Sequence, residues 1–216
     1  MSKYPRSYHL DFSPGATSDD KIADYIDSLI GIRIIISEKI DGENTGMNND
    51  GVYARSHASF TTSAWSREVR QIHNQKVNGN LEEGVYIFGE NMEGIHSINY
   101  TDMSSYFYIF GVRDNDTWLS WDKVEEYSYL LDIPIVPVLF DGLVNSKKEL
   151  TEIVTRIMSK PSELGGEKEG IVIRKYEEFQ NDDFANCLQK WVRKNHVTTT
   201  KHWTRTWKKA QLNNYE

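Results

Sequence analysis

SEKIDGENTG, residues 37–46, contains the most informative lysine of the chain. Lys39 follows an apolar run at residues 32–36 and comes just before Asp41-Gly42, and Asp-Gly pairs are typical of tight turns. The pattern therefore predicts a lysine at the end of a strand, next to a turn. A lysine can act as a nucleophile once its amine is neutral, and nearby cations or partial burial lower its pKa. Taken alone, the same pattern is also typical of a hairpin turn preceded by a surface lysine.

The composition is typical of a soluble globular protein. Of the 216 residues, 38% are hydrophobic and 26% are charged, and no apolar stretch is long enough to span a bilayer. The first six residues are not followed by the apolar segment that a secretory signal needs. The chain has one cysteine, Cys187, which excludes an internal disulfide and a cysteine metal cluster. We therefore expect a cytoplasmic protein with no membrane partner.

The charge is distributed unevenly along the chain. The formal net charge is −7, yet residues 187–216 carry seven basic residues and one acidic residue, a balance of +6, which leaves −13 on the rest. An acidic body with a basic end suggests a local phosphate-binding surface, although a solvated basic helix is an equally good interpretation. We expect residues 196–216 to form a basic helical extension of a domain at residues 1–195. Trp203 and Trp207 would share one face of this helix and dock it onto the body.

Hydrophobic periodicity and turn residues predict an α+β fold. Helices are expected where apolar residues recur at helical spacing, at residues 18–29, 63–77, 121–131 and 146–158. Strands are expected in short runs of branched and aromatic residues, at residues 32–39, 51–56, 84–90, 106–113, 133–139, 170–175 and 188–192. Residues 51–56 should form a hairpin with residues 32–39 across a turn at residues 48–51. Two prolines favour a sheet edge for residues 133–139. Several neighbouring strands look antiparallel, so we expect helices packed outside a curved sheet.

Three further places in the chain put charged residues at strand ends or within strands. In chain order they are Gly89-Glu90, Glu169-Gly170, and Lys190 with Arg193 and Lys194 close behind. Each place alone is typical of a solvated turn or of an amphipathic strand with exposed charges. The ordered set after Lys39 is much harder to explain in that way.

Together these motifs resemble the covalent nucleotidyltransferase superfamily, which comprises ATP-dependent RNA and DNA ligases and mRNA capping enzymes. Residues 38–44, Glu-Lys-Ile-Asp-Gly-Glu-Asn, are similar to its nucleophile motif Glu-Lys-x-His/Asp-Gly-x-Asn. Residues 3–6 (Lys-Tyr-Pro-Arg) and residues 190–193 (Lys-Trp-Val-Arg) are similar to ATP-dependent RNA ligases in particular. The resemblance covers residues 1–195. It implies a nucleotidyltransferase (ATP-grasp-like) ligase core of antiparallel sheets flanked by helices.

The resemblance also implies a role for each motif residue. Lys39 attacks the α-phosphate of ATP, expels pyrophosphate and forms a lysyl-AMP phosphoramidate. Glu90 holds the ribose hydroxyls, since an ionised carboxylate only accepts hydrogen bonds. Glu169 helps to hold a divalent cation, Mg²⁺ or Mn²⁺. Lys190 contacts the α-phosphate, and its charge is expected to lower the pKa of Lys39.

The rest of the expected nucleotide pocket follows from the same resemblance. Arg55 is similar to an arginine that contacts sugar and phosphate, and Phe110 to an aromatic residue that stacks on the purine. The neighbouring Phe107 and Tyr108 are expected to pack in the core. The remaining expected pocket residues flank the lysine nucleophile and are Glu38, Ile40 and Asn44.

Two positions depart from the family pattern. Relatives often carry Asp where this chain has Gly111, directly after Phe110. The family usually has Lys-x-Lys where this chain has Lys190 and Val192, which strand alternation places on one face. The second basic contact is therefore either absent or made by Arg193 after a local bend.

The sequence predicts an ATP-dependent RNA ligase. Such an enzyme transfers AMP from its lysine to a 5′-phosphate end and seals that end to a 3′-OH, with ATP as substrate and with RNA ends or a nicked duplex containing RNA as partner. A DNA ligase or another polynucleotide adenylyltransferase uses the same chemistry, so DNA stays open as a substrate. A non-catalytic nucleic-acid-binding relic is disfavoured because all four motif residues are present. The residues expected to bind the nucleic-acid backbone are Arg193, Lys194, Lys201, Arg205, Lys208 and Lys209.

The residues after position 195 are too few for a separate oligonucleotide-binding (OB) domain. Capping enzymes and many DNA ligases have such a domain, so its expected absence disfavours capping. It also leaves open whether a separate protein binds the ends that are sealed.

Overall fold

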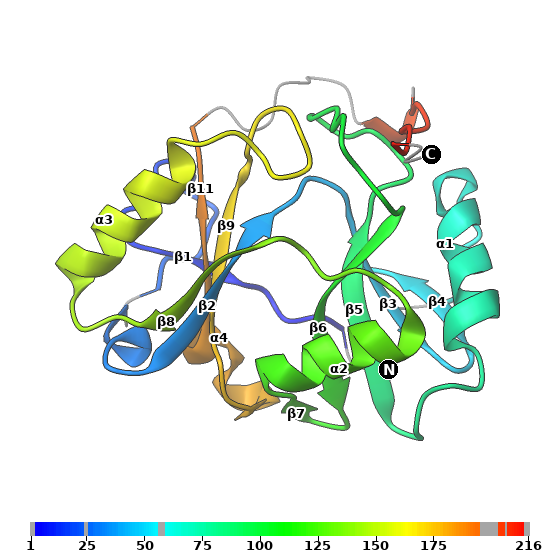
Figure 1. Ribbon diagram of the computed structural model, residues 1–216, viewed down its shortest axis with the longest axis horizontal. Helices are drawn as coiled ribbons and strands as arrows, with labels where there is room; N and C mark the ends of the chain where they lie inside the picture. Colours follow the sequence, from blue (N-terminus) through cyan, green and yellow to red (C-terminus); the bar gives the residue numbers. More distant parts are fainter. Residues whose placement is uncertain (1–2, 24–25, 56–58, 195–202, 206, 214–216) are drawn as a thin grey trace.

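The computed structural model describes residues 3–23, 26–55, 59–194, 203–205 and 207–213, which fold into two β-sheets (Figure 1). In order across sheet A, the strands are β1 (Tyr8–His9), β11 (Leu188–Val192), β9 (Gly170–Lys175), β2 (Arg33–Lys39) and β8 (Val138–Leu143). In order across sheet B, they are β10 (Phe179–Gln180), β7 (Thr117–Trp118), β6 (Phe107–Asp114), β5 (Val85–Asn91), β3 (Glu43–Asn48) and β4 (Gly51–Ala54). Paired strands are antiparallel except β1 and β11, so the predicted antiparallel α+β fold is confirmed.

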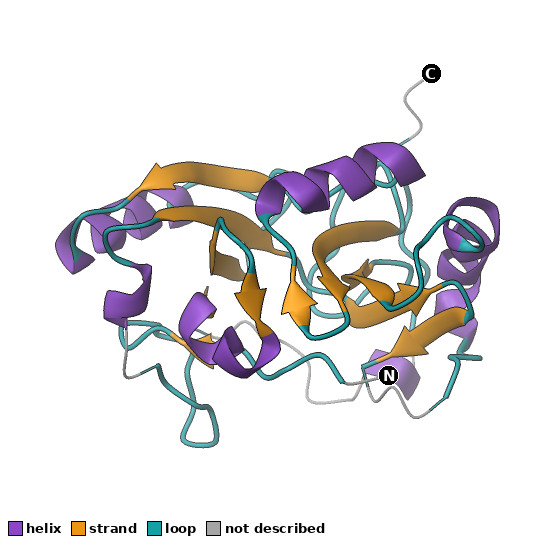
Figure 2. Cartoon of the chain, turned by 90° about the horizontal axis from the view of Figure 1, so that it is seen from below, coloured by secondary structure: helices purple, strands orange, loops and turns teal. Residues whose placement is uncertain are grey.

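Helices lie along the outside of the sheets (Figure 2). Three of the four predicted helices form: residues 63–77 as one helical stretch, and α2 and α3 near their predicted bounds. The helical stretch joins a 3-10 turn, α1 and a π-helix, with bounds Ala64–Ser66, Arg67–Ile72 and His73–Val77. The other α-helices are α2 (Trp121–Leu131), α3 (Lys147–Met158) and the short α4 (Phe184–Cys187). No helix in the described ranges has both the length and the apolar character needed to cross a membrane.

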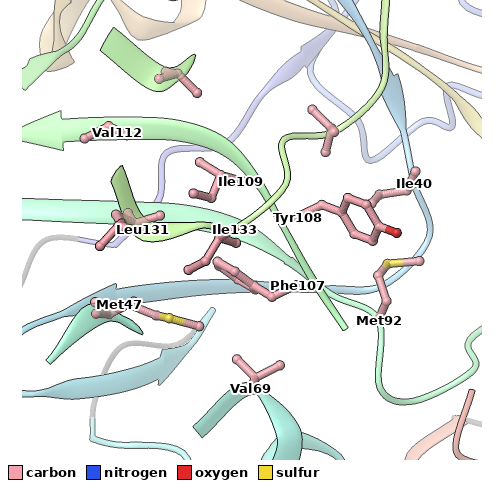
Figure 3. Close-up of a cluster of buried hydrophobic side chains, with 14 of the residues drawn as sticks. Ile40, Met47, Val69, Met92, Phe107, Tyr108, Ile109, Val112, Leu131 and Ile133 are labelled. Carbon is pink, nitrogen blue, oxygen red and sulfur yellow. The ribbon is translucent and has the colours of Figure 1, made fainter. Parts of the chain in front are cut away.

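Strand β2 is buried on both faces, and this fixes the position of its end. Ile34 and Ile36 pack in the cluster beneath α3, whereas Ile35 packs in the cluster formed by sheet B. Successive side chains of a strand point to opposite faces, so three consecutive isoleucines contribute to two cores. The larger core includes Phe107 from β6 and Met47 from β3 (Figure 3). The lysine that ends β2 is therefore held between two packed layers.

The predicted helix at residues 18–29 is wrong over most of its length. Only Ile26–Leu29 forms a 3-10 helix, and residues 24–25 lie outside the described ranges. The side chain of Asp20 accepts hydrogen bonds from the amide and hydroxyl of Thr17 at 3.1 and 3.0 Å, and these bonds close a turn at residues 17–20. The backbone on both sides of Ile22 bonds to the N-terminal strand at His9, so tertiary pairing replaces the helix.

The predicted hairpin partner of β2 is also wrong. Strand β4 pairs with β3, across the predicted turn at residues 48–51, where the side chain of Asn48 accepts the amides of Asp50 and Gly51. Strand β2 instead lies between β8 and β9. Strand β3 was not predicted as a strand, and neither were the two-residue strands β1, β7 and β10.

The strand predicted at residues 133–139 occupies a sheet edge as expected, but it is shifted. Strand β8 begins at Val138, directly after Pro137, and it pairs with β2 alone. Proline lacks the amide hydrogen that a ladder needs, which explains why regular pairing begins after it.

The C-terminal segment is not the predicted α-helix where it is described. Trp203–Arg205 forms a single 3-10 turn, and residues 207–213 run in an extended conformation along the body. The backbone of this segment bonds to residues 93–103: the Lys208 carbonyl accepts the Ile95 amide at 2.9 Å, and the Ala210 amide donates to Glu93 at 2.8 Å. The predicted docking role of the two tryptophans is confirmed, since the rings of Trp203 and Trp207 lie 5.0 and 6.3 Å from the ring of Trp65.

Candidate active site

The end of β2 opens into a cavity of about 940 Å³ whose walls come from both sheets and both ends of the chain. A smaller cavity of about 100 Å³ adjoins it and shares Lys39, Asn44 and Glu90 with it. The larger cavity brings together six predicted site residues, Lys39, Asn44, Arg55, Glu90, Glu169 and Lys190. The smaller one adds Glu38, Ile40 and Phe110. A third cavity, of about 520 Å³ near the end of α2, contains none of the predicted site residues.

Backbone packing shapes the turn after Lys39. A Cβ atom at Gly42 would lie 2.5 Å from the carbonyl oxygen of Asn91, so only glycine lets the end of β5 approach the turn. The carboxylate of Asp41 accepts the amides of Ser97 and Ile98 at 2.7 and 3.0 Å. The Asp-Gly pair therefore fastens the nucleophile turn to the two segments that flank it, in addition to leaving room for a ligand.

Lys39 and Glu169 form a direct ion pair, with 2.6 Å between Nζ and Oε2. The pair arises from strand register, because Lys39 on β2 lies opposite Gly170 on β9. A Cβ atom at Gly170 would lie 2.2 Å from the carbonyl oxygen of Trp191, so this glycine allows β11 to lie close beside β9. The Glu169 side chain is 6% exposed and the Lys39 side chain 28%, which leaves the amine accessible from the cavity.

The pKa of Lys39 is raised, contrary to our expectation. Burial alone would lower it, but the charges of Glu169 and Glu90 outweigh that effect. The pKa of Lys190 is the one that is lowered, by burial and by the charge of Lys39. Without a bound anion the carboxylates therefore control the charge of Lys39, and it rests as an ammonium ion.

Glu90 ends up in an environment that resists ionisation. Burial and, to a smaller extent, the charge of Glu169 raise its pKa to about 8, although Lys39 acts in the opposite direction. Its Oε1 atom accepts the amide of Gly42 at 3.2 Å, which fixes the carboxyl group at the cavity wall. At neutral pH this group is therefore mostly protonated, and it can donate as well as accept a hydrogen bond, which adds to the acceptor role that we expected.

The smaller cavity contains unsatisfied polar atoms beside an aromatic ring. One carboxylate oxygen of Glu38 accepts the amide of Glu163 at 3.0 Å, while the other, like the side-chain oxygen of Asn44, is buried with no hydrogen-bond partner among the described residues. Phe110 lines the same cavity. In contrast, Phe107 and Tyr108 are 0% and 2% exposed and belong to the core, as predicted. Buried polar atoms without partners are costly, so this cavity is suited to a polar aromatic ligand.

The basic strand β11 contributes one lysine to the cavity. Lys190 and Val192 both line it, which confirms that they share a face. The guanidinium of Arg193 instead forms an ion pair with Glu167 at 2.6 Å, and its amide bonds to the carbonyl oxygen of Glu169. Arg193 therefore does not line the cavity in this arrangement. Lys194 is exposed at the end of the strand.

The described part of the basic C-terminal segment lies close to the cavity. Lys208 is exposed, whereas Lys209 is paired with Glu68 at 2.7 Å. Lys201 lies outside the described residues, and so does the side chain of Arg205. The described residues therefore do not test whether Lys201, Arg205, Lys208 and Lys209 bind nucleic acid together, and this role stays a prediction.

Two groups of residues that line the larger cavity had no predicted role in the site. Trp203 and Thr204 line the larger cavity, and the ring of Trp203 stacks on that of His96 at 3.8 Å between centroids. Lys3, Tyr4, Pro5, Arg6 and Ser7 line it from the opposite end of the chain. For residues 3–7 the sequence offered one signal, the similarity of residues 3–6 to RNA ligases. It offered no signal that Trp203 and Thr204 would line the cavity.

The acidic residues at the cavity fit a cation that is completed by a phosphate ligand. No group of three or more histidine, cysteine or acidic side chains able to hold a metal occurs among the described residues. Glu169 offers hard oxygen donors on the cavity wall. Mg²⁺ is commonly held by one or two carboxylates together with substrate phosphates, so this donor set is adequate for Mg²⁺ or Mn²⁺.

The fold is that of the nucleotidyltransferase-type ligases. A Naegleria gruberi RNA ligase solved with ATP and manganese superposes with a TM-score of 0.59 at 16% sequence identity, covering 89% of this chain and 58% of that one. An archaeal ATP-dependent RNA ligase gives 0.58 at 12% identity, covering 89% and 48%. A putative ATP-dependent DNA ligase from Aquifex aeolicus gives 0.55 at 17% identity, covering 89% and 50%.

The sequence profile of the RNA ligase family matches residues 32–192, and the chain belongs to this family. No curated protein sequence matches it. The chain spans about half the length of the solved ligases that it resembles.

Proposed function

We propose that this protein is an ATP-dependent RNA ligase that works through a lysyl-AMP intermediate. The observation that supports this most strongly is the cavity between the sheets, where Lys39 is paired with Glu169 and where Glu90 and Lys190 also lie. A nucleophile, two carboxylates and a second cation are the groups that a reaction at a phosphate needs. Three of these residues lie on different strands and Glu169 directly precedes a fourth, and their convergence is hard to explain by surface solvation alone.

In the first step, Nζ of Lys39 attacks the α-phosphorus of ATP. The P–N bond forms, the bond from that phosphorus to the bridging oxygen breaks, and pyrophosphate leaves with the electron pair. Lys190 stabilises the negative charge on the α-phosphate oxygens. Glu169 is the acceptor nearest to the proton that Lys39 must lose, at 2.6 Å.

The charge of Glu169 also controls when Lys39 becomes reactive. The pKa of Lys39 stays high while Glu169 is an unshared anion beside it. A divalent cation held by Glu169 and the triphosphate would supply positive charge that favours the neutral amine and a more electrophilic phosphorus. Lys39 is in this way kept protonated until substrate is bound.

The smaller cavity is proposed to hold adenosine. Phe110 offers a ring for stacking on the purine, and the unpartnered oxygens of Glu38 and Asn44 can accept hydrogen bonds from amino or hydroxyl groups. Ile40 lines the same space. Glu90 lines both cavities and Arg55 lines the larger one, where ribose and phosphate would be placed.

In the later steps, AMP moves from Lys39 to the 5′-phosphate of a strand, and a 3′-OH displaces AMP to seal the ends. We propose a nucleotidyltransferase domain at residues 1–195, and we propose that the basic residues from the end of this domain onward, after β11, bind the nucleic-acid backbone. These residues are Arg193, Lys194, Lys201, Arg205, Lys208 and Lys209. Lysine and arginine contacts to phosphate depend strongly on salt, which makes this role measurable.

Nicked duplexes test the function directly. Four duplexes would carry RNA or DNA on the 3′-OH side and RNA or DNA on the 5′-phosphate side, each incubated with ATP and Mg²⁺ or Mn²⁺, with Lys39→Ala as the inactive control. We expect sealing of the duplexes that carry RNA at the nick. Sealing of the all-DNA duplex alone would favour a DNA ligase, and nucleic-acid binding without any covalent reaction would favour a binding relic.

A further inference from the structure

We propose that the N-terminal arm, residues 3–7, binds the β- and γ-phosphates of ATP, with Lys3 and Arg6 as the contacting side chains. This inference rests on the proposed ligase function, and it assigns the group that receives the leaving pyrophosphate. All five arm residues line the cavity of about 940 Å³ that also contains Lys39 and Lys190.

The arm crosses from one sheet to the other beside the cavity. The ring of Tyr4 lies 5.2 to 5.4 Å from four aromatic rings, those of Phe88, Phe110, Trp118 and Phe184. After the arm, β1 pairs with β11 in sheet A, placing His9 opposite Lys190. In Figure 1 this part of the chain, in dark blue, runs between the two sheets. The arm is therefore anchored at both ends.

This anchoring holds the two cations of the arm in place. Lys3 and Arg6 are exposed and flank the half-buried Tyr4 and Pro5, and proline restricts the backbone between them. A side chain whose backbone is already fixed loses less conformational entropy when it binds a ligand. The arm is thus suited to contacting a ligand of fixed position.

The charges around the cavity leave cations available for a polyanion. Lys39 is paired with Glu169, whereas Lys3, Arg55 and Lys190 have no ion pair among the described residues. Arg6 donates a hydrogen bond to the backbone carbonyl of Asp19 at 2.7 Å and shares the Asp20 carboxylate with His9 through longer contacts of 3.4 and 3.5 Å, and its side chain stays 48% exposed. The acidic residues on the cavity wall are Asp20, Glu43, Glu90 and Glu169.

These cations divide naturally along a triphosphate. Lys190 lies on β11, which pairs with β9. Strand β9 begins directly after Glu169, the partner of Lys39. Lys190 is therefore placed to contact the α-phosphate that Lys39 attacks. Lys3 and Arg6 line the same cavity from another segment and are left for the phosphates beyond it. When the bond at the α-phosphorus breaks, the pyrophosphate gains one negative charge. Cations already aimed at it stabilise the transition state for its departure.

The test separates ATP chemistry from strand chemistry. The double variant Lys3→Ala, Arg6→Ala is compared with wild type and with Lys148→Ala, Arg156→Ala on α3, which removes the same two charges far from the cavity. The first assay follows covalent labelling by ATP. The second follows the transfer of AMP from labelled enzyme to added pyrophosphate, which forms ATP. The third follows sealing of a strand that already carries AMP, which consumes no ATP and releases no pyrophosphate.

We expect the arm variant to need at least about tenfold more ATP and about tenfold more pyrophosphate for half-maximal rates, since charge-assisted hydrogen bonds to phosphate are among the strongest that a protein makes. The sealing of the pre-adenylated strand should fall by much less, and the α3 variant should match wild type in all three assays.

Wild-type dependence on both ATP and pyrophosphate in the arm variant would overturn the proposal. A defect confined to the third assay would overturn it too, because the arm would then bind the strand. Absence of labelling in wild-type protein would instead contradict the proposed function. Circular dichroism and the milder pair Lys3→Gln, Arg6→Gln separate a binding defect from misfolding.

Discussion

Replacing Glu90 with glutamine should stabilise the protein at neutral pH and weaken its chemistry. The pKa of Glu90 is about 8 in the folded protein against 4.5 for the free group, mainly because the carboxyl is buried. Between these values the unfolded chain ionises Glu90 while the folded protein keeps it protonated. The contribution of Glu90 to the free energy of unfolding is therefore fully present below pH 4.5 and is lost as the pH rises towards 8. Glutamine keeps the acceptor for the Gly42 amide and cannot ionise.

The size of the effect follows from the width of this window. Each pKa unit corresponds to about 1.4 kcal/mol. The free energy of unfolding of the glutamine variant should therefore exceed that of wild type by about 3 kcal/mol at pH 7 and by less than about 1 kcal/mol at pH 5. The Lys39–Glu169 ion pair should be little affected, because Glu90 is already mostly protonated at pH 7. Covalent labelling by ATP should fall in the same variant, since an amide cannot become an anion that accepts both ribose hydroxyls.

Urea unfolding in EDTA at pH 5, 6, 7 and 8 measures the difference in free energy of unfolding between Glu90→Gln and wild type. The matched control is Glu152→Gln on α3, which removes the same charge at a position whose side chain is 67% exposed. This control should leave the pH dependence unchanged. Equal stability differences between Glu90→Gln and wild type at pH 5 and pH 7, or a less stable variant at pH 7, would refute the reasoning.

The remaining predictions concern the divalent cation, the adenine base of ATP and the basic C-terminal segment. Glu169→Ala should lose most labelling by ATP. Glu169→Asp should recover little of it, because a shorter carboxylate cannot contact both Lys39 and a divalent cation. Labelling that persists in EDTA would contradict the role of the cation. Phe110→Ala should raise the KM for ATP by about tenfold, within the 1–3 kcal/mol typical of base stacking on an aromatic ring, and Phe110→Trp should restore most of it; an unchanged KM in the alanine variant would assign Phe110 to packing. Neutral residues at Lys201, Arg205, Lys208 and Lys209 should weaken binding to nicked duplexes and flatten its salt dependence while labelling at Lys39 survives. Unchanged affinity and salt slope would count against that role, and loss of labelling would mean that the segment closes the nucleotide cavity, where Trp203 already lies.

Elements with strong local signals were predicted well from the sequence. Helix α2 begins at Trp121 and ends at Leu131 as predicted, and β9 has the predicted bounds Gly170–Lys175. Apolar periodicity and capping or turn residues are local properties, and they were enough at these places. The nucleophile was placed correctly at the end of β2 for the same reason, because the isoleucine run and Asp41-Gly42 adjoin it.

What the sequence did not predict depends on partners that are distant in the chain. Strand β3 contains Asn44 and Gly46, which are poor strand formers, and it exists because β4 and β5 pair with it. The helix predicted from Ser18 gave way to pairing with His9. The charge of Lys39 could not be deduced from neighbours in sequence, since its closest charged partner, Glu169, is 130 positions away. The walls formed by the N-terminal arm and by Trp203 also arise only in the folded chain.

Covalent labelling of Lys39 tests the central claim most directly. The protein is incubated with ATP labelled at the α-phosphate and with Mg²⁺ or Mn²⁺, denatured, and digested to find the modified peptide, with GTP as the alternative donor. We predict label from ATP that survives denaturation, maps to Lys39, and is released by pyrophosphate. Lys39→Ala and Lys39→Arg should show none while remaining folded, because neither side chain supplies a neutral amine. Label on another residue, or label retained in either folded variant, would contradict the account.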